Sequence, residues 1–257
     1  LSEDRPVEPS ALIDQLQSKY KFPFKLVEGN SAPSEGEAFL LEFDGQLFSV
    51  LYINNKVPPG TMDEAISKAR LWPQAQAAVD AHKTHYIVAN LNAGAELAEQ
   101  RSAAAFLTFI CAALSDLTPA SAINWTNAQT LLPAQSAVSG SKGLQENGEW
   151  PTPLWVNSIL FGEPPVQRGT RKIGLITQGL RNFVGRELEF APSTLEMQAL
   201  LARSINLSGY LISNGPVLAD GDTVGVSETE RIRVEHTVVQ STQTPVYRLT
   251  LETANGA

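Results

Sequence analysis

Residues 184–234 read VGRELEFAPSTLEMQALLARSINLSGYLISNGPVLADGDTVGVSETERIRV, and this stretch decides the fold class of the chain. Charged and apolar residues alternate from Glu187 to Phe190, which predicts a short strand. A stripe of apolar and small side chains at helical spacing follows, and it stops at an Asn-Gly-Pro sequence ending with Pro216. Glycine suits the left-handed cap of a helix, and proline cannot continue one. An Asp-Gly-Asp turn at residues 220–222 then leads into another strand pattern.

Two positions have the spacing of a capping box, in which a Ser or Thr and a Glu three residues later both bond backbone amides at a helix start. Ser193 and Glu196 predict the start of the helix just described. Thr61 and Glu64 predict a second helix, which Pro73 should kink or restart because proline lacks the amide proton that the helix needs.

The rest of the chain repeats the alternation of strands and helices. An Asp-Gly pair at residues 44–45 lies between two apolar runs, which is a strong signal for a β-hairpin. We predict further strands at residues 86–91, 123–125, 154–161, 172–179, 187–190, 223–226, 231–240 and 245–252, and helices at 10–20, 61–82 and 97–117. This order predicts an α+β fold of largely antiparallel sheets with helices packed on one face. Two ferredoxin-like halves would satisfy the same pattern.

The composition divides the chain into four regions. We expect an N-terminal arm and short helix in residues 1–36 and a first α+β half in residues 37–135. Residues 136–150 are rich in Ser, Gly, Gln and Asn, which predicts a flexible linker or loop. A second α+β half should occupy residues 151–257, and the pattern leaves open whether the two halves pack as one domain.

Net charge and cysteine content limit the kinds of binding partner and the cellular compartment that we expect for this protein. The 257 residues carry a formal net charge of −8, and an acidic chain repels nucleic-acid phosphates and anionic membranes. We therefore expect neither nucleic acid nor membrane as a partner. Cys111 is the only cysteine, so the fold cannot depend on an internal disulfide. Residues 1–10 lack the pattern of a secretory signal, and we expect a cytoplasmic protein.

Three residues are candidates for catalysis in a hydrolase-type site: Glu187, Glu189 and His85. In a strand, Glu187 and Glu189 share one face, and paired carboxylates can serve as general acid and base. The alternative is a solvated face without chemistry. Arg186 falls on the opposite, apolar face, where a buried guanidinium would need a carboxylate partner.

The sequence predicts neither a metal site nor a cofactor. His82 and His85 have a spacing that can hold a metal on one helix, but a helix end and a strand start should separate them. Asp220 and Asp222 resemble the start of a calcium loop, but the later ligand positions of such a loop are not met. A tight turn closed by the aspartate side chains is the simpler explanation.

Trp150, Glu146 and Glu149 are the candidate partner-binding residues. Trp150 ends the polar segment predicted to be a loop, and an aromatic side chain at a rim is typical of protein contacts. The acidic side chains would steer a basic partner towards it.

Three stretches carry a family resemblance: ARLWPQAQAAVDAHKTHYIVANL at residues 69–91, PTPLWVNSILF at 151–161 and GYLISNGPVLADGDTVG at 209–225. They resemble the bacterial domain-of-unknown-function family numbered 4261, over about residues 39–234. That family has no assigned catalytic residues, so the resemblance implies none here. Some relatives of that family lie among secretion-system and polymorphic-toxin genes, so the resemblance implies a context of toxin neutralisation.

These observations support three hypotheses of different classes. The first is a non-enzymatic protein-binding module, such as an immunity or accessory protein whose partner is a basic domain of a secreted toxin. The second is a hydrolase that uses the carboxylate and histidine site. The third is a structural subunit of a larger assembly.

Overall fold

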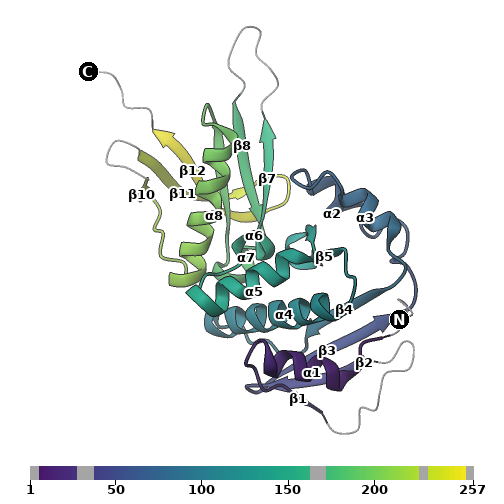
Figure 1. The fold of residues 1–257 in the computed structure, drawn as a ribbon. Coiled ribbons are helices and arrows are strands. Elements are labelled where there is room, and N and C mark those ends of the chain that lie inside the picture. The colour runs from purple at the N-terminus through teal and green to yellow at the C-terminus, as the bar shows by residue number, and fades with distance from the viewer. Residues whose placement is uncertain (1–5, 28–37, 163–171, 226–230, 253–257) are drawn as a thin grey trace. The chain divides into compact units, whose positions relative to one another are not determined.

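The computed structural model describes residues 6–27, 38–162, 172–225 and 231–252. The chain forms two compact units, Leu1–Leu154 and Trp155–Ala257, which are called the first and second unit below (Figure 1). Each unit combines helices with a largely antiparallel sheet, which confirms the predicted α+β class.

The first unit contains a four-stranded sheet in the order β1-β2-β3-β4, in which every neighbouring pair is antiparallel. A separate antiparallel pair is formed by β5 and β6. The strands are β1 (Lys25–Leu26), β2 (Ala38–Phe43), β3 (Gln46–Ile53), β4 (His85–Asn90), β5 (Ala122–Trp125) and β6 (Thr130–Pro133). The helices are α1 (Pro9–Ser18), α2 (Asp63–Lys68), α3 (Ala75–Ala81), α4 (Leu97–Leu117), η1 (Thr126–Ala128), α5 (Gln135–Asn147) and α6 (Thr152–Trp155), which crosses the boundary between the units.

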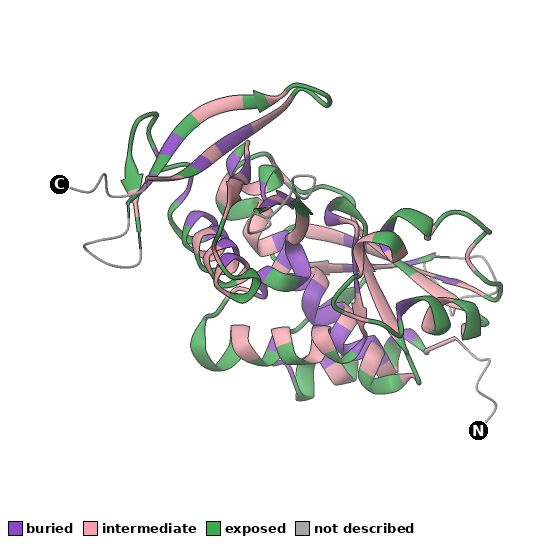
Figure 2. Cartoon of the chain, turned by 90° about the horizontal axis from the view of Figure 1, so that it is seen from above, coloured by how far each residue is buried: buried purple, intermediate pink, exposed green. Residues whose placement is uncertain are grey.

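The core of the first unit lies between α1, α4 and one face of the four-stranded sheet. Aromatic rings dominate this core because Phe22, Phe24, Phe43, Phe48 and Phe106 pack against one another with ring centroids 4.9–6.1 Å apart. Such contacts add to the free energy of burying the rings. Buried residues are frequent along α4 and alternate with partly exposed ones along β3. Figure 2 shows the buried residues of the chain in purple.

Helix α4 spans Leu97–Leu117, as its apolar pattern predicts. Among the described helices it is the one long and apolar enough to cross a membrane by length and composition. A core helix of a soluble protein passes the same test, and α4 buries nine residues, among them Phe109 and Ile110.

The second unit contains a six-stranded sheet in the order β10-β11-β12-β9-β8-β7. Its strands are β7 (Asn157–Gly162), β8 (Ile173–Gln178), β9 (Glu187–Ser193), β10 (Thr223–Val224), β11 (Arg231–Val239) and β12 (Thr244–Glu252). Its helices are α7 (Arg181–Val184) and α8 (Met197–Asn214), and α8 packs on β7, β8 and β9. All neighbouring strands are antiparallel except β9 and β12.

The strand orders differ from the ferredoxin-like alternative. That fold places a strand between the two parallel strands of a split βαβ unit. In the first unit the strand order follows the sequence, and in the second unit the parallel strands β9 and β12 are direct neighbours.

Two local predictions are wrong. Residues 136–150 are not a flexible linker, because α5 occupies Gln135–Asn147 and packs along α4. Its Gly and Ser residues allow close packing, which composition alone does not distinguish from a loop. A Cβ at Gly140 would lie 2.7 Å from Pro151 and 3.8 Å from Thr108 of α4. The capping boxes also fail: α2 begins after Met62 and α8 after Glu196, each without a side-chain cap. Ser193 instead ends β9.

Candidate functional site

The carboxylate of Glu187 is buried at the start of β9, with 2% of the residue exposed. One oxygen accepts hydrogen bonds from the Thr177 hydroxyl at 2.7 Å and the Leu180 amide at 3.1 Å. The other accepts from the amides of Gly179 at 2.8 Å and Arg181 at 3.2 Å. These bonds satisfy backbone donors of the turn that leads into α7, where no backbone acceptor is available. The side chain therefore stabilises the turn between β8 and α7.

Glu189, on the same face as Glu187, and Arg186, on the opposite face, are also engaged in the fold. Glu189 forms a two-pronged ion pair with Arg248 on β12, with N–O distances of 3.1 and 3.3 Å. Among the described residues, Arg186 has no carboxylate partner of the kind expected for it. Its guanidinium donates to backbone carbonyls of Thr237 and Val246 at 3.5 Å and lies 5.7 Å from the centre of the Tyr247 ring.

His85, the third catalytic candidate, lies in the first unit, whereas both glutamates lie in the second. Its Nδ1 is 2.8 Å from the carbonyl of Asn55. The neighbouring His82 accepts a hydrogen bond from the Val57 amide at Nε2, 2.9 Å away, and its Nδ1 contacts the carbonyl of Val79. Both imidazoles therefore hold the segment between β3 and α2.

The candidate partner-binding residues follow α5 and its C-terminus. Gly148 ends the helix in the left-handed conformation, with φ +67°. Glu146 and Glu149 are exposed, and Glu146 lies 3.9 Å from Lys142 one helical turn earlier. Trp150 is half-buried, and the guanidinium carbon of Arg101 lies 5.7 Å from its ring centre. Trp150 thus ends the short connection that follows α5, and its ring lies beside an arginine side chain.

The Asp-Gly-Asp sequence forms a turn closed by its own side chains. Asp222 accepts a hydrogen bond from the Ala219 amide and Asp220 accepts one from the His236 amide, both at 2.7 Å. Within the described ranges, no group of three His, Cys, Asp or Glu side chains is placed to hold a metal ion.

Cys111 lies on α4 and packs against the core of the first unit. Burial raises the pKa of its thiol to about 12. The thiolate is the nucleophilic form of cysteine, so this residue is a packing residue rather than a nucleophile near neutral pH.

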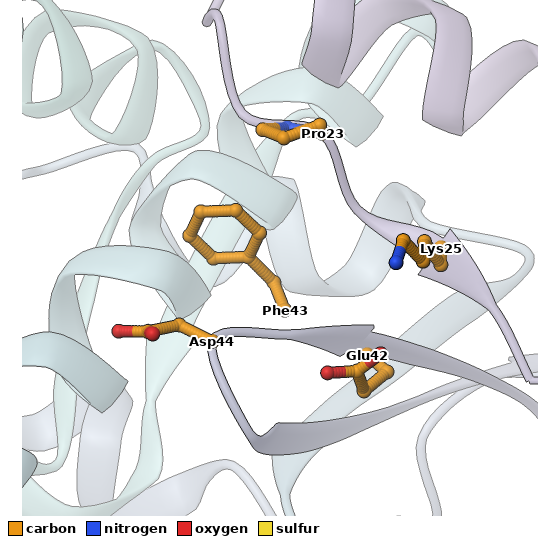
Figure 3. A pocket seen from close by; sticks show the side chains of 5 residues that line it. All are labelled: Pro23, Lys25, Glu42, Phe43 and Asp44. Atoms are coloured by element: carbon orange, nitrogen blue, oxygen red, sulfur yellow. The ribbon is translucent and has the colours of Figure 1, made fainter.

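A small hollow opens beside the β2–β3 hairpin and is lined by Pro23, Lys25, Glu42, Phe43 and Asp44 (Figure 3). Its volume is about 260 Å³, below the roughly 300–1,000 Å³ typical of small-molecule sites. Phe43 also belongs to the aromatic core, where its ring centre is 5.0 Å from that of Phe24. The charged residues that line the hollow are one lysine and two carboxylates, and they do not form a recognisable catalytic arrangement.

The face of the four-stranded sheet opposite the core is also apolar, and we call it the outer face. Strand alternation and register place a row of apolar residues across its centre, formed by Ala38, Leu51 and Ile87. Its other apolar members on the three long strands are Leu40, Leu47, Ile53 and Ala89. Ile87 is 47% exposed, and Leu91, just beyond β4, is 54% exposed. Lys25, Glu42 and His85 lie at the rim of the outer face.

The sequence contains a signal for this outer face that the strand predictions did not use. An antiparallel strand with one solvated face alternates apolar and polar residues, whereas a strand covered on both faces is apolar throughout. In AFLLEF of β2 and QLFSVLYI of β3, apolar residues occupy most positions on both faces, with Glu42, Gln46 and Ser49 as the polar exceptions. The outward residues Leu40, Leu47 and Leu51 therefore predict a face that is covered. The hairpin prediction used only the residues of the turn.

Net charge is concentrated in the same unit. Seventeen acidic and ten basic side chains give residues 1–154 a formal net charge of −7, out of −8 for the whole chain. The second unit is close to neutral. Electrostatic attraction of a basic partner would therefore act mainly on the first unit.

Comparison with known proteins gives a single family match. No curated protein and no solved structure matches the chain. Residues 176–250, from within β8 to within β12, match a family model. This match confirms the family resemblance within the second unit, and it does not reach the resembling stretch at residues 69–91. The family whose model matches this segment of the second unit is described as Domain of unknown function (DUF4261).

Proposed function

We propose that this protein is a non-enzymatic, cytoplasmic protein-binding module, and that the outer face of the first unit is its contact surface. The observation that carries the proposal is the apolar row Ala38–Leu51–Ile87 with a polar rim. Contiguous apolar surface with a polar border is typical of protein interaction sites.

The partner that suits this surface is a protein with an apolar patch edged by basic side chains. The net charge of −7 in residues 1–154 supports this chemistry, because opposite charges steer two proteins together and raise the association rate. A basic toxin domain, neutralised by this protein as its immunity or accessory factor, is one partner of this kind and follows from the family resemblance.

The engagement of the candidate catalytic groups favours binding over hydrolysis. Glu187 accepts four hydrogen bonds from the fold, and Glu189 is paired with Arg248. A general base must instead reach the proton that it abstracts from a substrate.

A pair of matched variants tests the proposal. Ile87→Lys places a charge in the middle of the outer face, whereas Val238→Lys does the same on β11, where Val238 is 39% exposed. The wild type and both variants are immobilised in parallel, and proteins retained from cell extract are quantified. A specific partner should remain on the wild type and on Val238→Lys, and Ile87→Lys should weaken its binding by about 2 kcal/mol, as measured by calorimetry.

Two outcomes would contradict the proposal. Equal retention of every protein by the wild type and Ile87→Lys would remove the outer face as the contact surface. Sedimentation of the purified chain provides the second readout: a dimer that Ile87→Lys dissociates would identify a second copy, rather than a basic protein, as the occupant.

A further inference from the structure

Two of the chain's three histidines hold the same backbone segment, which leads from the end of β3 towards α2. His82 follows α3 and His85 begins β4, and their ring centres lie 6.3 Å apart. His82 binds the amide of Val57, and His85 binds the carbonyl of Asn55. The segment is therefore hydrogen-bonded to two imidazoles, one at the end of α3 and one at the start of β4.

The hydrogen bonds of His82 require its neutral form. The carbonyl of Val79 can only accept a hydrogen bond, so Nδ1 of His82 must carry the proton. Nε2 is then unprotonated and accepts the Val57 amide at 2.9 Å. A second proton on the ring would occupy Nε2 and turn it into a donor that faces another donor.

His85 responds differently to protonation. Its Nδ1 faces the carbonyl of Asn55 as a donor at 2.8 Å, and this bond persists when the ring becomes charged. Protonation of both rings would, however, place two positive charges about 6 Å apart. The bond of His82 to Val57 is therefore the acid-sensitive one, and His85 adds repulsion.

Other ionisable groups surround the pair. Lys56 of the held segment donates to the backbone carbonyl of Asp80 at 2.5 Å, and Gln76 donates to the Asp80 carboxylate at 2.9 Å. Lys83 lies between the histidines in sequence, and Tyr52 of β3 lies 3.4 Å from the side chain of Asn54.

We propose that His82 and His85 form a pH-sensitive clasp, which holds the segment at residues 54–57 when His82 is neutral and releases it when His82 is protonated. Histidine is the side chain whose charge ordinarily changes between about pH 5 and pH 8. Release would free the connection between β3 and α2, next to the rim of the outer face where His85 lies. The clasp is independent of whether the outer face binds a protein.

Amide hydrogen exchange of the full chain, followed by NMR, tests the clasp directly. The readout is the protection of the Val57 amide after correction for the intrinsic pH dependence of exchange. When the pH is lowered from about 7.5 to about 5.5, the protection factor of the Val57 amide in the wild type should fall about tenfold. The protection of the amides of α4 should not change. Unchanged Val57 protection, or an equal loss throughout α4, would overturn the proposal.

Substitutions at the three histidines assign the effect. His82→Ala should leave the Val57 amide unprotected at both pH values. His85→Ala should keep its protection at the higher pH and retain an acid response. His236→Ala is the matched control, because His236 bonds the Leu218 carbonyl in the second unit and should leave the response unchanged. If Val57 protection still falls in acid in His82→Ala, protonation of His82 is not the cause and the assignment is overturned. If His82→Ala does not fold, the pH dependence of Val57 protection in the wild type alone decides the proposal.

Discussion

Thr177 and Glu187 form a buried side-chain pair, with 2.7 Å between the Thr177 hydroxyl and a Glu187 carboxylate oxygen. The same hydroxyl oxygen accepts the amide proton of Leu188 at 2.8 Å. The pair therefore joins β8 to β9 while the carboxylate satisfies three amides of the turn between them. This buried polar pair lies within residues 176–250, the segment that matches the family model, and its role there is structural.

We expect Glu187→Ala to lower the free energy of unfolding by about 3 kcal/mol or more, because it leaves several buried donors without an acceptor. Glu189→Ala is the matched control: it removes a partly exposed ion pair and should cost about 1 kcal/mol or less. Urea denaturation followed by circular dichroism measures both. A Glu187→Ala protein as stable as the wild type that lost a hydrolytic activity would instead favour the enzyme hypothesis.

Asp116 should contribute stability that is lost in acid. Burial acts most strongly and opposes its charged form, but hydrogen bonds from Lys19, Tyr20 and Gln15 together outweigh burial and lower the pKa of the carboxyl. A lowered pKa means that its stabilisation is present above the unfolded value of about 3.9 and disappears as the pH falls through the folded value.

We therefore expect Asp116→Asn to destabilise the protein by about 1–2 kcal/mol at neutral pH and to weaken its acid sensitivity. Denaturation midpoints at pH 7 and pH 3 check both effects. The difference between the wild type and Asp116→Asn should shrink at the lower pH, and a constant difference would contradict the role of the carboxylate charge.

Cys111 should resist alkylation in the folded protein. With a thiol pKa of about 12, very little thiolate forms at pH 8. Reaction with iodoacetamide should be about a thousandfold slower than in urea, where the thiol regains an ordinary pKa. Mass spectrometry at timed intervals measures the two rates, and similar rates would show that the thiol is accessible.

Gly215 ends α8 at φ +85°, a conformation that strains residues with a Cβ. With ψ at −168°, this backbone conformation is essentially restricted to glycine, and Gly215→Ala should destabilise by about 1–3 kcal/mol. Gly143 in α5 has ordinary space for a Cβ, with its nearest contacts at 3.8 Å, and Gly143→Ala should stabilise by about 0.5–1 kcal/mol through helix propensity. Thermal unfolding of both variants compares the two glycines, and stabilisation by both changes would contradict the strain at Gly215.

Trp150 stays a predicted contact residue. If a partner reaches the C-terminal end of α5, Trp150→Ala should weaken binding by about 2 kcal/mol, and raised salt should slow association more than it speeds dissociation. Lys142→Ala in the preceding helix α5 is a control, because the contact of Lys142 with Glu146 is exposed and 3.9 Å long. Calorimetry and stopped flow at two salt concentrations with the captured partner measure the effects, and equal affinity of Trp150→Ala and the wild type would remove it as an anchor.

The sequence by itself determined the elements whose signals are local. The Asp-Gly pair at 44–45 predicts its hairpin because both residues adopt positive φ, at +52° and +73°. The apolar run of α4 predicts its helix over the observed bounds, and the Asn-Gly-Pro sequence predicts the end of α8 at Asn214. In each case the chemistry that fixes the backbone lies within a few residues.

Only the tertiary structure decided the roles that depend on distant neighbours. Helix α5 forms from a Gly- and Ser-rich segment because α4 offers a surface against which small residues pack closely. Glu187 has the sequence pattern of a catalytic carboxylate, but the fold brings four donors to it, the Thr177 hydroxyl of β8 and three amides of the β8–α7 turn. His82 likewise acquires its bond to Val57 from a segment 25 positions earlier in the chain. Periodicity and spacing carry no information about such contacts, because the folded chain brings the partners together from separate elements.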